Sequence, residues 1–312
     1  VVWAEGFGYA DIASKAPITP KTVFRIGSAS KVLTSAGVGV LLDQGRLHLD
    51  DTIQKLVPDF PEKQWPVTLR QLMAHTAGVR SDSGDEGPLF GMNCDRPVDA
   101  FKEFADRELL FEPGTEYRYS SYGWIVVSAA VEAAAEEPFL NFMRKKVFEP
   151  LGMDSTVPDS TTVLPESATF YFPKFAADPR YGPDVMREVN YTCYSGASVF
   201  LSTPTDMVRF ALGVKGGKLL KPETFALLQA PQKTASGAET GYALGWDIEV
   251  ANVNGRDTRT IGHDGDQLAG QVSSLITFPD SDIVVSVISN MSYAKAYDVA
   301  LKVAEAFLAN RK

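Results

Sequence analysis

A serine and a lysine three residues apart, Ser28 and Lys31, form a pair that could do covalent chemistry. On a helix, side chains at positions i and i+3 lie on one face about 5 to 6 Å apart, so the Lys31 amine can stand beside the Ser28 hydroxyl. A serine hydroxyl becomes an effective nucleophile when an adjacent base removes its proton. The pair predicts a serine nucleophile, although roughly one Ser-x-x-Lys is expected by chance in a chain of this composition.

Two later polar segments strengthen this prediction. Tyr119-Ser120-Ser121 follows a loop that contains Pro113 and Gly114, and it comes just before an apolar segment that begins at Tyr122. Further on, Gly262-His263-Asp264-Gly265 ends one strand-like segment and precedes another. Glycines allow the backbone to approach a ligand closely. The three segments together indicate a site assembled from distant parts of the chain.

The elements that must position these residues are a mixture of helices and strands. Strands are expected at 1–10 and 22–26, followed by a helix for which Ser28 can be the N-cap and which ends at Gly45. Apolar spacing predicts further helices and strands, namely helices at 69–75, 100–109, 122–135, 139–148, 206–214 and 293–309, and strands at 242–250, 257–262, 270–278 and 282–290. In the last helix, the side chains of Val299, Val303, Ala304 and Phe307 are expected to face inward.

Strands at both ends of the chain enclose a helical middle. The predicted fold class is therefore α/β (α+β), with an antiparallel sheet flanked by helices and fed by both termini. The expected division is a sheet domain of residues 1–45 and 190–312, with a mostly helical inserted domain of residues 46–189. The site would lie where the two meet.

Composition excludes some functions. The net charge is −9 and no Lys/Arg-rich run occurs, so a nucleic-acid partner is not expected. The longest apolar run, Trp124 to Ala135, is shorter than the about 20 residues of a membrane span. The two cysteines, Cys94 and Cys193, have no metal-ligand or redox spacing and are expected to be buried free thiols.

The three histidines are scattered and form no metal-ligand pattern, so no metal site is predicted. His75 is expected to be structural, holding a helix end or turn by hydrogen bonds, and His48 is expected at the surface. No Gly-x-Ser-x-Gly sequence is present, which argues against an α/β-hydrolase nucleophile elbow.

The order of the three segments resembles the serine β-lactamase-like and penicillin-binding-protein-like family. This family includes class C β-lactamases, DD-peptidases, D-aminopeptidases, family VIII carboxylesterases and a mitochondrial β-lactamase-like group. Its motifs are Ser-x-x-Lys, Tyr-x-Asn or Ser-x-Asn, and Lys/His-x-Gly. Further segments look like family landmarks, namely Gly8 to Asp11, Leu47 to Asp51, Leu72 to Gly78, Pro150 to Met153, Ser202 to Met207 and Gly241 to Trp246.

The resemblance implies a β-lactamase/transpeptidase-like fold, with the nucleophile at the junction of a sheet domain and an all-α insertion, and no cofactor. Family members usually have a helix and a strand before the segment that begins at Val1. By position, Ser28 would be the acylated nucleophile, Lys31 would take or relay its proton, and Tyr119 would be the second-motif tyrosine. Whether Lys31 or Tyr119 is the base stays open. The oxyanion hole would use the backbone N–H groups of Ser28 and Asp266, and each such donor typically contributes about 3 kcal/mol to lowering the barrier.

Departures from the family motifs concern the substrate. Ser121, His263, Asp264, Gly265 and Asp266 are the expected substrate-binding positions. Where many β-lactamases have Lys-Thr-Gly, this chain has a histidine, which is mostly neutral at pH 7 when unperturbed, and an acid. Ser121 stands where the family often has Asn, and a hydroxyl reaches less far than an amide. These changes favour esters and small or uncharged peptides over anionic β-lactams.

The leading functional hypothesis is a serine hydrolase, a carboxylesterase or peptidase with at most weak β-lactamase activity, that works through an acyl-enzyme. One alternative is a β-lactamase or DD-peptidase acting on penicillins or peptidoglycan. Another is a polymer-forming scaffold, because mitochondrial members of the family share the Tyr-Ser-Ser/Thr pattern. The expected partner is a small ester, amide, β-lactam or peptide, and a homo-oligomer is left open. The resemblance favours a periplasmic or secreted location, although no signal peptide is visible in the chain.

Overall fold

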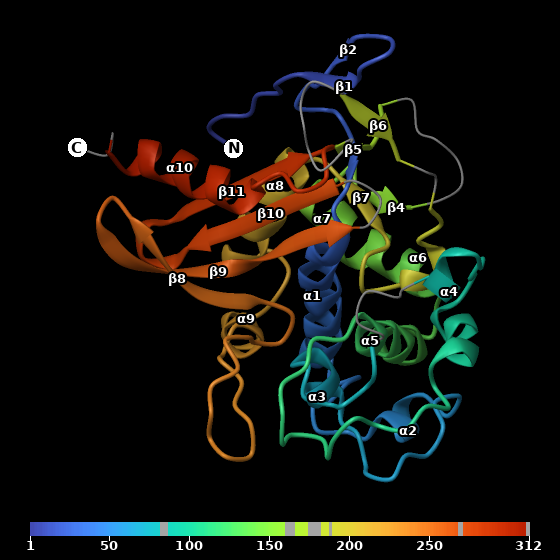
Figure 1. Cartoon of the computed structure of the whole chain (residues 1–312). Helices are drawn as coiled ribbons and strands as arrows, with labels where there is room; N and C mark the ends of the chain where they lie inside the picture. The colour runs from blue at the N-terminus through green and yellow to red at the C-terminus, as the bar shows by residue number, and fades with distance from the viewer. Residues whose placement is uncertain (82–86, 160–165, 174–181, 187–188, 268–270, 310–312) are drawn as a thin grey trace.

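A four-stranded antiparallel sheet, in the order β11-β10-β9-β8, dominates the C-terminal part of the chain (Figure 1). The computed structural model describes residues 1–81, 87–159, 166–173, 182–186, 189–267 and 271–309. The strands of this sheet are β8 (Asp247–Val253), β9 (Arg256–Gln267), β10 (Gln271–Phe278) and β11 (Ile283–Ser289). The predicted antiparallel sheet is confirmed, but β8 begins later than expected and β9 extends through the His263 segment.

Helices cover both faces of this sheet (Figure 1). On one face, α10 (Ala296–Ala309) packs against β11, β10 and β8. On the other face, α8 (Pro204–Lys215) packs against β11 and β10, and α1 (Ser30–Asp43) packs against β9. The sheet therefore separates a smaller apolar core under α10 from the main core around α1.

The inward face of α10 differs from the prediction. Ala300 and Ala304 are buried against the sheet, whereas Val299 and Phe307 are 47% and 39% exposed. Alanines at i and i+4 lie on one face of a helix and let its backbone come close to the strands. The larger side chains lie beside this contact, so the expected inward position of Val299 and Phe307 is wrong.

The central helix of the molecule is α1, whose residues from Ser30 to Leu41 are all buried. It packs against α5 (Ser121–Ala135) and α9 (Pro222–Leu228). It is preceded by a 3₁₀ turn, η1 (Gly27–Ala29), so that Ala29 and not Ser28 is the N-cap. The predicted capping role of Ser28 is wrong, because its backbone is already part of the turn and its hydroxyl has another partner.

The middle of the chain is mainly helical, as predicted, but apart from α5 its elements are short. They are α2 (Ile53–Leu56), α3 (Leu69–Met73), α4 (Gly87–Phe90), the 3₁₀ helix η2 (Pro97–Glu103), α5, α6 (Phe139–Met143), the π-helical η3 (Arg144–Phe148) and α7 (Glu149–Leu151). The helix expected at 100–109 is wrong, since only the 3₁₀ stretch forms there. The proposed domain division stays a prediction.

Short strands join the two ends of the chain to its middle. A three-stranded sheet has the order β3-β7-β4, from Phe24–Arg25, Phe200–Ser202 and Val157–Pro158. Two small antiparallel pairs are β1 (Tyr9–Asp11) with β2 (Ala16–Pro17), and β5 (Tyr171–Pro173) with β6 (Pro183–Val185). The strand expected over 1–10 is therefore present only at its end. A short 3₁₀ turn, η6 (Thr192–Tyr194), precedes β7, and another, η7 (Pro279–Ser281), lies between β10 and β11.

The cysteines are joined, which corrects the prediction of free thiols. Cys94 and Cys193 form a disulfide across a sequence separation of 99 residues. Around it, the Cys94 N–H donates to Thr192 Oγ1 at 3.2 Å, and the Phe90 ring lies 5.3 Å from that of Tyr194. Spacing along the chain gave no sign of this pairing, because folding of the helical middle brings the two cysteines together.

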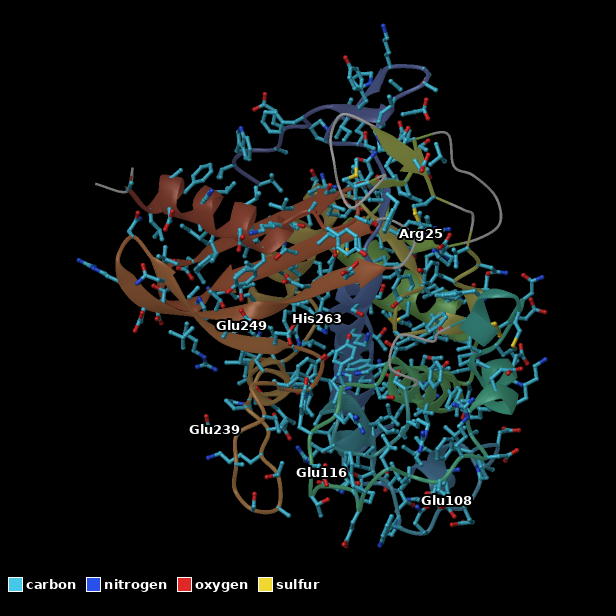
Figure 2. All side chains as sticks on the ribbon, in the orientation of Figure 1. Arg25, Glu108, Glu116, Glu239, Glu249 and His263 are labelled. Atoms are coloured by element: carbon cyan, nitrogen blue, oxygen red, sulfur yellow. A yellow bond between two sulfur atoms is a disulfide. The ribbon has the colours of Figure 1, made fainter. Side chains whose placement is uncertain are left out.

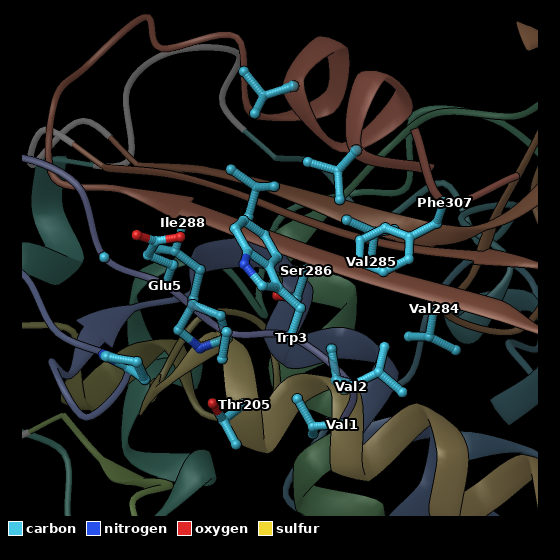
Figure 3. Close-up of a pocket in the computed structure, with 18 of the residues that line it drawn as sticks. Val1, Val2, Trp3, Glu5, Thr205, Val284, Val285, Ser286, Ile288 and Phe307 are labelled. Atoms are coloured by element: carbon cyan, nitrogen blue, oxygen red, sulfur yellow. The ribbon is translucent and has the colours of Figure 1, made fainter. Parts of the chain in front are cut away.

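The segment before β1 borders an apolar pocket of about 420 Å³ (Figure 3). Trp3 lies among side chains of β11 and α10, and its ring centroid is 6.4 Å from that of Phe307. None of the predicted site residues lines this pocket. In the described part of the chain, no helix has both the length and the apolar character needed to cross a membrane.

Candidate active site

Ser28 and Lys31 are in direct contact. Lys31 Nζ donates to Ser28 Oγ at 2.9 Å and to the Ala197 carbonyl at 3.2 Å. The Lys31 side chain is fully buried, whereas Ser28 is partly exposed. Burial disfavours the charged ammonium relative to the neutral amine, which is the form able to accept a proton. The predicted pair thus has an accessible hydroxyl beside a desolvated amine.

The turn that carries Ser28 is fixed from several sides. The Ile26 N–H donates to the Phe200 carbonyl at 3.2 Å, and Ser273 Oγ on β10 donates to the Ile26 carbonyl at 2.7 Å. Upstream, Arg25 donates to Asp159 at 2.6 Å in a largely buried ion pair. These contacts hold the strand that leads into η1, so the Ser28 hydroxyl has a defined position.

Strand β9 reaches the same turn through Gly265. A Cβ on Gly265 would lie 2.0 Å from the Ile26 carbonyl oxygen and 2.5 Å from Ser273 Oγ, so only glycine allows this approach. The next residue is Asp266, whose backbone was assigned by resemblance to the oxyanion hole. The close approach of Gly265 to Ile26 brings this part of β9 beside the Ser28 turn. The oxyanion role itself stays a prediction.

The acceptor of Lys31 belongs to a segment that the sequence analysis did not single out, the 194–198 turn. Thr34 Oγ1 on α1 donates to the Gly196 carbonyl at 2.9 Å, and Ser128 Oγ on α5 donates to the Ser195 carbonyl at 3.0 Å. Gly196 has φ +72° and a Cβ there would lie 2.8 Å from the Trp124 carbonyl. The turn is thus held by both central helices. Its glycine was the one sequence signal that could have revealed it.

Tyr119 lies on the other side of Lys31. Lys31 Nζ is 4.8 Å from the centre of the Tyr119 ring, a cation–π distance if the amine is charged. The centre of the Tyr119 ring is also 4.2 Å from that of the His75 ring, and Tyr119 is 38% exposed. The structure therefore brings the three predicted catalytic residues together.

His75 organises the segment that contains Tyr119. The Ser120 N–H donates to His75 Nδ1 at 3.0 Å, and the Arg118 N–H donates to the His75 carbonyl at 2.8 Å. Burial, followed by the charge of Lys31, holds the pKa of His75 well below its usual range. The backbone of His75 has φ +59°, in the left-handed region. The predicted structural role of His75, holding a turn by hydrogen bonds, is confirmed. His48 is exposed, also as predicted.

Ser121, a predicted substrate-binding residue, is the first residue of α5 and is buried. Its N–H donates to Ser81 Oγ at 3.3 Å, while the preceding Ser120 caps the helix by accepting from the Gly123 N–H at 3.1 Å. Ser121 therefore lies next to Tyr119 at a helix N-terminus. Its contact with a substrate stays a prediction.

His263 is also buried, and both of its ring nitrogens are occupied. Nε2 lies 2.9 Å from the hydroxyl of Tyr242, and Nδ1 lies 2.6 Å from the Asp264 carbonyl oxygen. Burial, and then the charge of Lys31, lower the pKa of His263 to about 3. Figure 2 shows His263 on β9 beside α1. In the sequence, Tyr242 was noted as part of the Gly241–Trp246 segment and as the start of the strand expected at 242–250, and its contact with His263 was missed.

The side chain of Asp264 lies on the face of β9 opposite to that of His263. Neighbouring residues of a strand point to opposite sides of the sheet, and Asp264 is paired with Ser274 of β10. Together with Glu249 and Tyr297 it borders a small pocket on the α10 side. Asp264 was predicted to bind substrate. Its backbone carbonyl contacts His263, but its side chain is directed away from Tyr242. In the described residues, no group of three or more His, Cys, Asp or Glu side chains could hold a metal ion.

Comparisons with known proteins agree with this geometry. The Beta-lactamase family model matches residues 1–309. The human mitochondrial serine beta-lactamase-like protein LACTB is 25% identical, over 98% of this chain and 74% of its own length. Penicillin-binding protein 4* of Bacillus subtilis (strain 168) is 25% identical, over 99% of this chain and 70% of its own length.

Solved structures show the same fold. The octameric penicillin-binding protein homologue from Pyrococcus abyssi superposes with a TM-score of 0.83 at 22% identity, covering 99% of this chain and 71% of that one. The D-amino acid amidase from Ochrobactrum anthropi SV3, complexed with L-phenylalanine amide, has a TM-score of 0.76 at 24% identity, covering 98% and 89%. These structures are similar in fold, and the family model spans nearly every residue here. The chain belongs to the beta-lactamase family.

Proposed function

We propose that the protein is a serine hydrolase that cleaves ester or amide bonds through an acyl-enzyme on Ser28. The observation that carries this proposal is the 2.9 Å contact between the partly exposed Ser28 hydroxyl and the buried Lys31 amine. Amidases and penicillin-binding proteins are among the similar proteins, which supports hydrolysis of an acyl bond as the reaction class.

In the proposed reaction, Ser28 Oγ attacks the substrate carbonyl carbon while its proton passes to the neutral Lys31 amine. The tetrahedral intermediate collapses, the bond to the leaving oxygen or nitrogen breaks, and the leaving group takes up a proton. Water then attacks the acyl carbon and gives a proton to Lys31, the bond from that carbon to Ser28 Oγ breaks, and Ser28 takes up this proton as the acid is released. Lys31 is the proposed base because of its contact with Oγ, and Tyr119, next to Lys31, is the proposed proton relay to the leaving group.

The preferred substrates are proposed to be short-chain esters or small uncharged amides. Both the neutral His263 and the buried Ser121 support this preference, since neither offers a cation to a substrate carboxylate. We expect p-nitrophenyl esters to be hydrolysed faster than nitrocefin. The opposite ranking would favour the β-lactamase or DD-peptidase alternative.

A fluorophosphonate probe tests the nucleophile directly. The folded protein is expected to be labelled at Ser28, as located by peptide mass spectrometry, and Ser28→Ala is expected to lose the label. Ser30→Ala is the matched control, because Ser30 is buried on the next turn and its hydroxyl accepts from the Phe200 N–H at 3.3 Å. Folded wild-type protein without labelling at Ser28 would refute the enzyme proposal.

The scaffold alternative rests on the Tyr119-Ser120-Ser121 pattern and on similarity to LACTB. Light scattering of the purified protein tests it. Large polymers together with an unreactive Ser28 would support a scaffold, whereas a small discrete species with a reactive Ser28 would contradict it.

A further inference from the structure

We propose that Tyr242 is a specificity-determining residue, because its hydrogen bond locks His263 as a neutral ring and so denies the third-motif position a cation for substrate carboxylates. This inference rests on the proposed function and names the class of substrate that the site selects. Tyr242 lies outside the three motifs.

Hydrogen-bond chemistry fixes the tautomer of His263. The Asp264 carbonyl oxygen, 2.6 Å from Nδ1, can only accept, so Nδ1 must carry a proton. In a neutral imidazole the other nitrogen, Nε2, is then an acceptor. The Tyr242 hydroxyl, 2.9 Å away, must be the donor. Each nitrogen of His263 is thereby occupied within the protein.

The pair is closed to solvent, since Tyr242 is 1% exposed and His263 is 4% exposed. Burial raises the pKa of Tyr242 well above its usual range, so its hydroxyl keeps the proton that it donates. The Tyr242 ring is held by His75, whose ring centroid is 4.6 Å away, and its edge faces Tyr119 at 6.5 Å. The donor is therefore as fixed in position as its acceptor.

The charges that face His263 act in opposite directions. Burial opposes protonation of the ring in either state of Lys31, and Lys31 on α1 opposes it further whenever its amine is charged. Asp247 at the start of β8, 3.6 Å from Nδ1, would favour protonation. Burial raises the pKa of Asp247 itself to about 6, which weakens its charge. His75 packs against Tyr242 and adds no charge, because burial holds its pKa well below the usual range, and the Tyr119 ring lies 6.2 Å from that of His263. The balance leaves His263 uncharged.

A neutral His263 with no spare donor cannot stabilise a carboxylate beside the reacting carbonyl. In the Lys-Thr-Gly version of the motif, the corresponding position offers a fixed cation. The difference predicts discrimination between two esters that share a leaving group, p-nitrophenyl butyrate and the mono-p-nitrophenyl ester of succinic acid. The wild-type protein should hydrolyse the uncharged ester with the higher kcat/KM.

NMR titration of the histidine side chains in the full-length protein tests the Tyr242–His263 hydrogen bond, called the lock below, without needing any catalytic activity. His→Gln variants assign the signals. We expect His263 in the wild type to be the Nδ1–H tautomer and to stay neutral down to pH 5, while exposed His48 serves as the reference. Tyr242→Phe keeps the ring but removes the donor, and should raise the midpoint of His263 by about one pH unit or more. Tyr117→Phe is the matched control, because its ring lies 6.2 Å from that of Tyr242 and should leave the midpoint unchanged.

An Nε2–H tautomer, protonation of wild-type His263 above pH 5, or an unchanged midpoint in Tyr242→Phe would each overturn the lock. The specificity step is tested by His263→Lys, which should raise kcat/KM for the succinyl ester relative to the butyryl ester at least about tenfold, as expected for a hydrogen bond to a charged group. An unchanged ratio in a folded variant would overturn that step. Because the titration needs no activity, failure of the lock is distinguishable from an unreactive Ser28.

Discussion

Reduction of the Cys94–Cys193 disulfide is expected to lower the free energy of unfolding substantially. The bond closes a loop with a sequence separation of 99 residues. For a loop of this length, the chain-entropy model gives about 4.7 kcal/mol of stabilisation at 25 °C. With an unfolding entropy of about 2.1 cal/mol/K per residue, a chain of 312 residues should lose about 7 °C in Tm.

Thermal unfolding followed by circular dichroism, with and without a phosphine reductant, measures this effect. Cys94→Ala with Cys193→Ala should unfold at a slightly lower temperature than the reduced wild type, because it also loses buried sulfur atoms and leaves a small cavity. The double variant is the control, since the reductant should not change its Tm. A reduced wild type with unchanged Tm would refute the reasoning, as would a double variant that responds to the reductant.

Activity should be affected less than stability. The 194–198 turn follows Cys193 directly, but Thr34 and Ser128 hold it independently through their hydrogen bonds to the Gly196 and Ser195 carbonyls. Fluorophosphonate labelling of the reduced protein below its Tm is therefore expected to continue. Complete loss of labelling in folded, reduced protein would mean that the disulfide itself sets the position of the Lys31 acceptor.

Three further predictions concern the site. Lys31→Met keeps an unbranched buried side chain but removes the amine, so hydrolysis of p-nitrophenyl butyrate should fall by about 10² to 10⁴, the range of general-base catalysis; labelling at the wild-type rate would contradict this. Gly265→Ala places a Cβ 2.0 Å from the Ile26 carbonyl, and the forced movement of β9 should cost about 1 to 3 kcal/mol in urea unfolding and lower kcat; unchanged kcat would show that β9 does not position the Ser28 turn. The pKa of His263 is about 3 in the folded protein and about 6.5 in the unfolded chain, so the unfolded chain binds a proton first as the pH falls below 6.5. The free energy of unfolding should therefore be about 2 kcal/mol lower at pH 5 than above pH 6.5. His263→Gln should lack this part of the pH dependence in urea unfolding, while the opposite contribution of Asp247, whose folded pKa is raised to about 6, remains in both proteins; identical pH dependence would contradict the neutral state of His263.

Local spacing predicted the core of the site well. Ser28 and Lys31 are close because three residues make nearly one helical turn, a relation that does not depend on the rest of the fold. Tyr119 and the His263 segment came from resemblance, and the structure brings Tyr119 within 4.8 Å of the Lys31 amine. The sheet strands followed from period-two alternation, which gave their presence more reliably than their ends.

Contacts between distant residues could not be predicted in this way. The pairing of Cys94 with Cys193, the Tyr242–His263 hydrogen bond and the Ala197 acceptor of Lys31 each join segments with no shared local pattern. The prediction of which residues of α10 face inward was wrong for a different reason. Hydrophobicity favoured Val299 and Phe307, but close packing on the sheet favoured the smaller alanines.

The left-handed backbone of His75 restricts how this site can vary. Glycine would adopt φ +59° at little cost, but it would remove the ring that contacts Tyr119 and Tyr242 and the Nδ1 acceptor of the Ser120 N–H. β-Branched and most other residues would meet the backbone strain without supplying the ring. In a saturation library at this position, few replacements should therefore survive selection for activity. Asparagine, which tolerates the left-handed region and offers a side-chain acceptor, is the candidate to rank first among them.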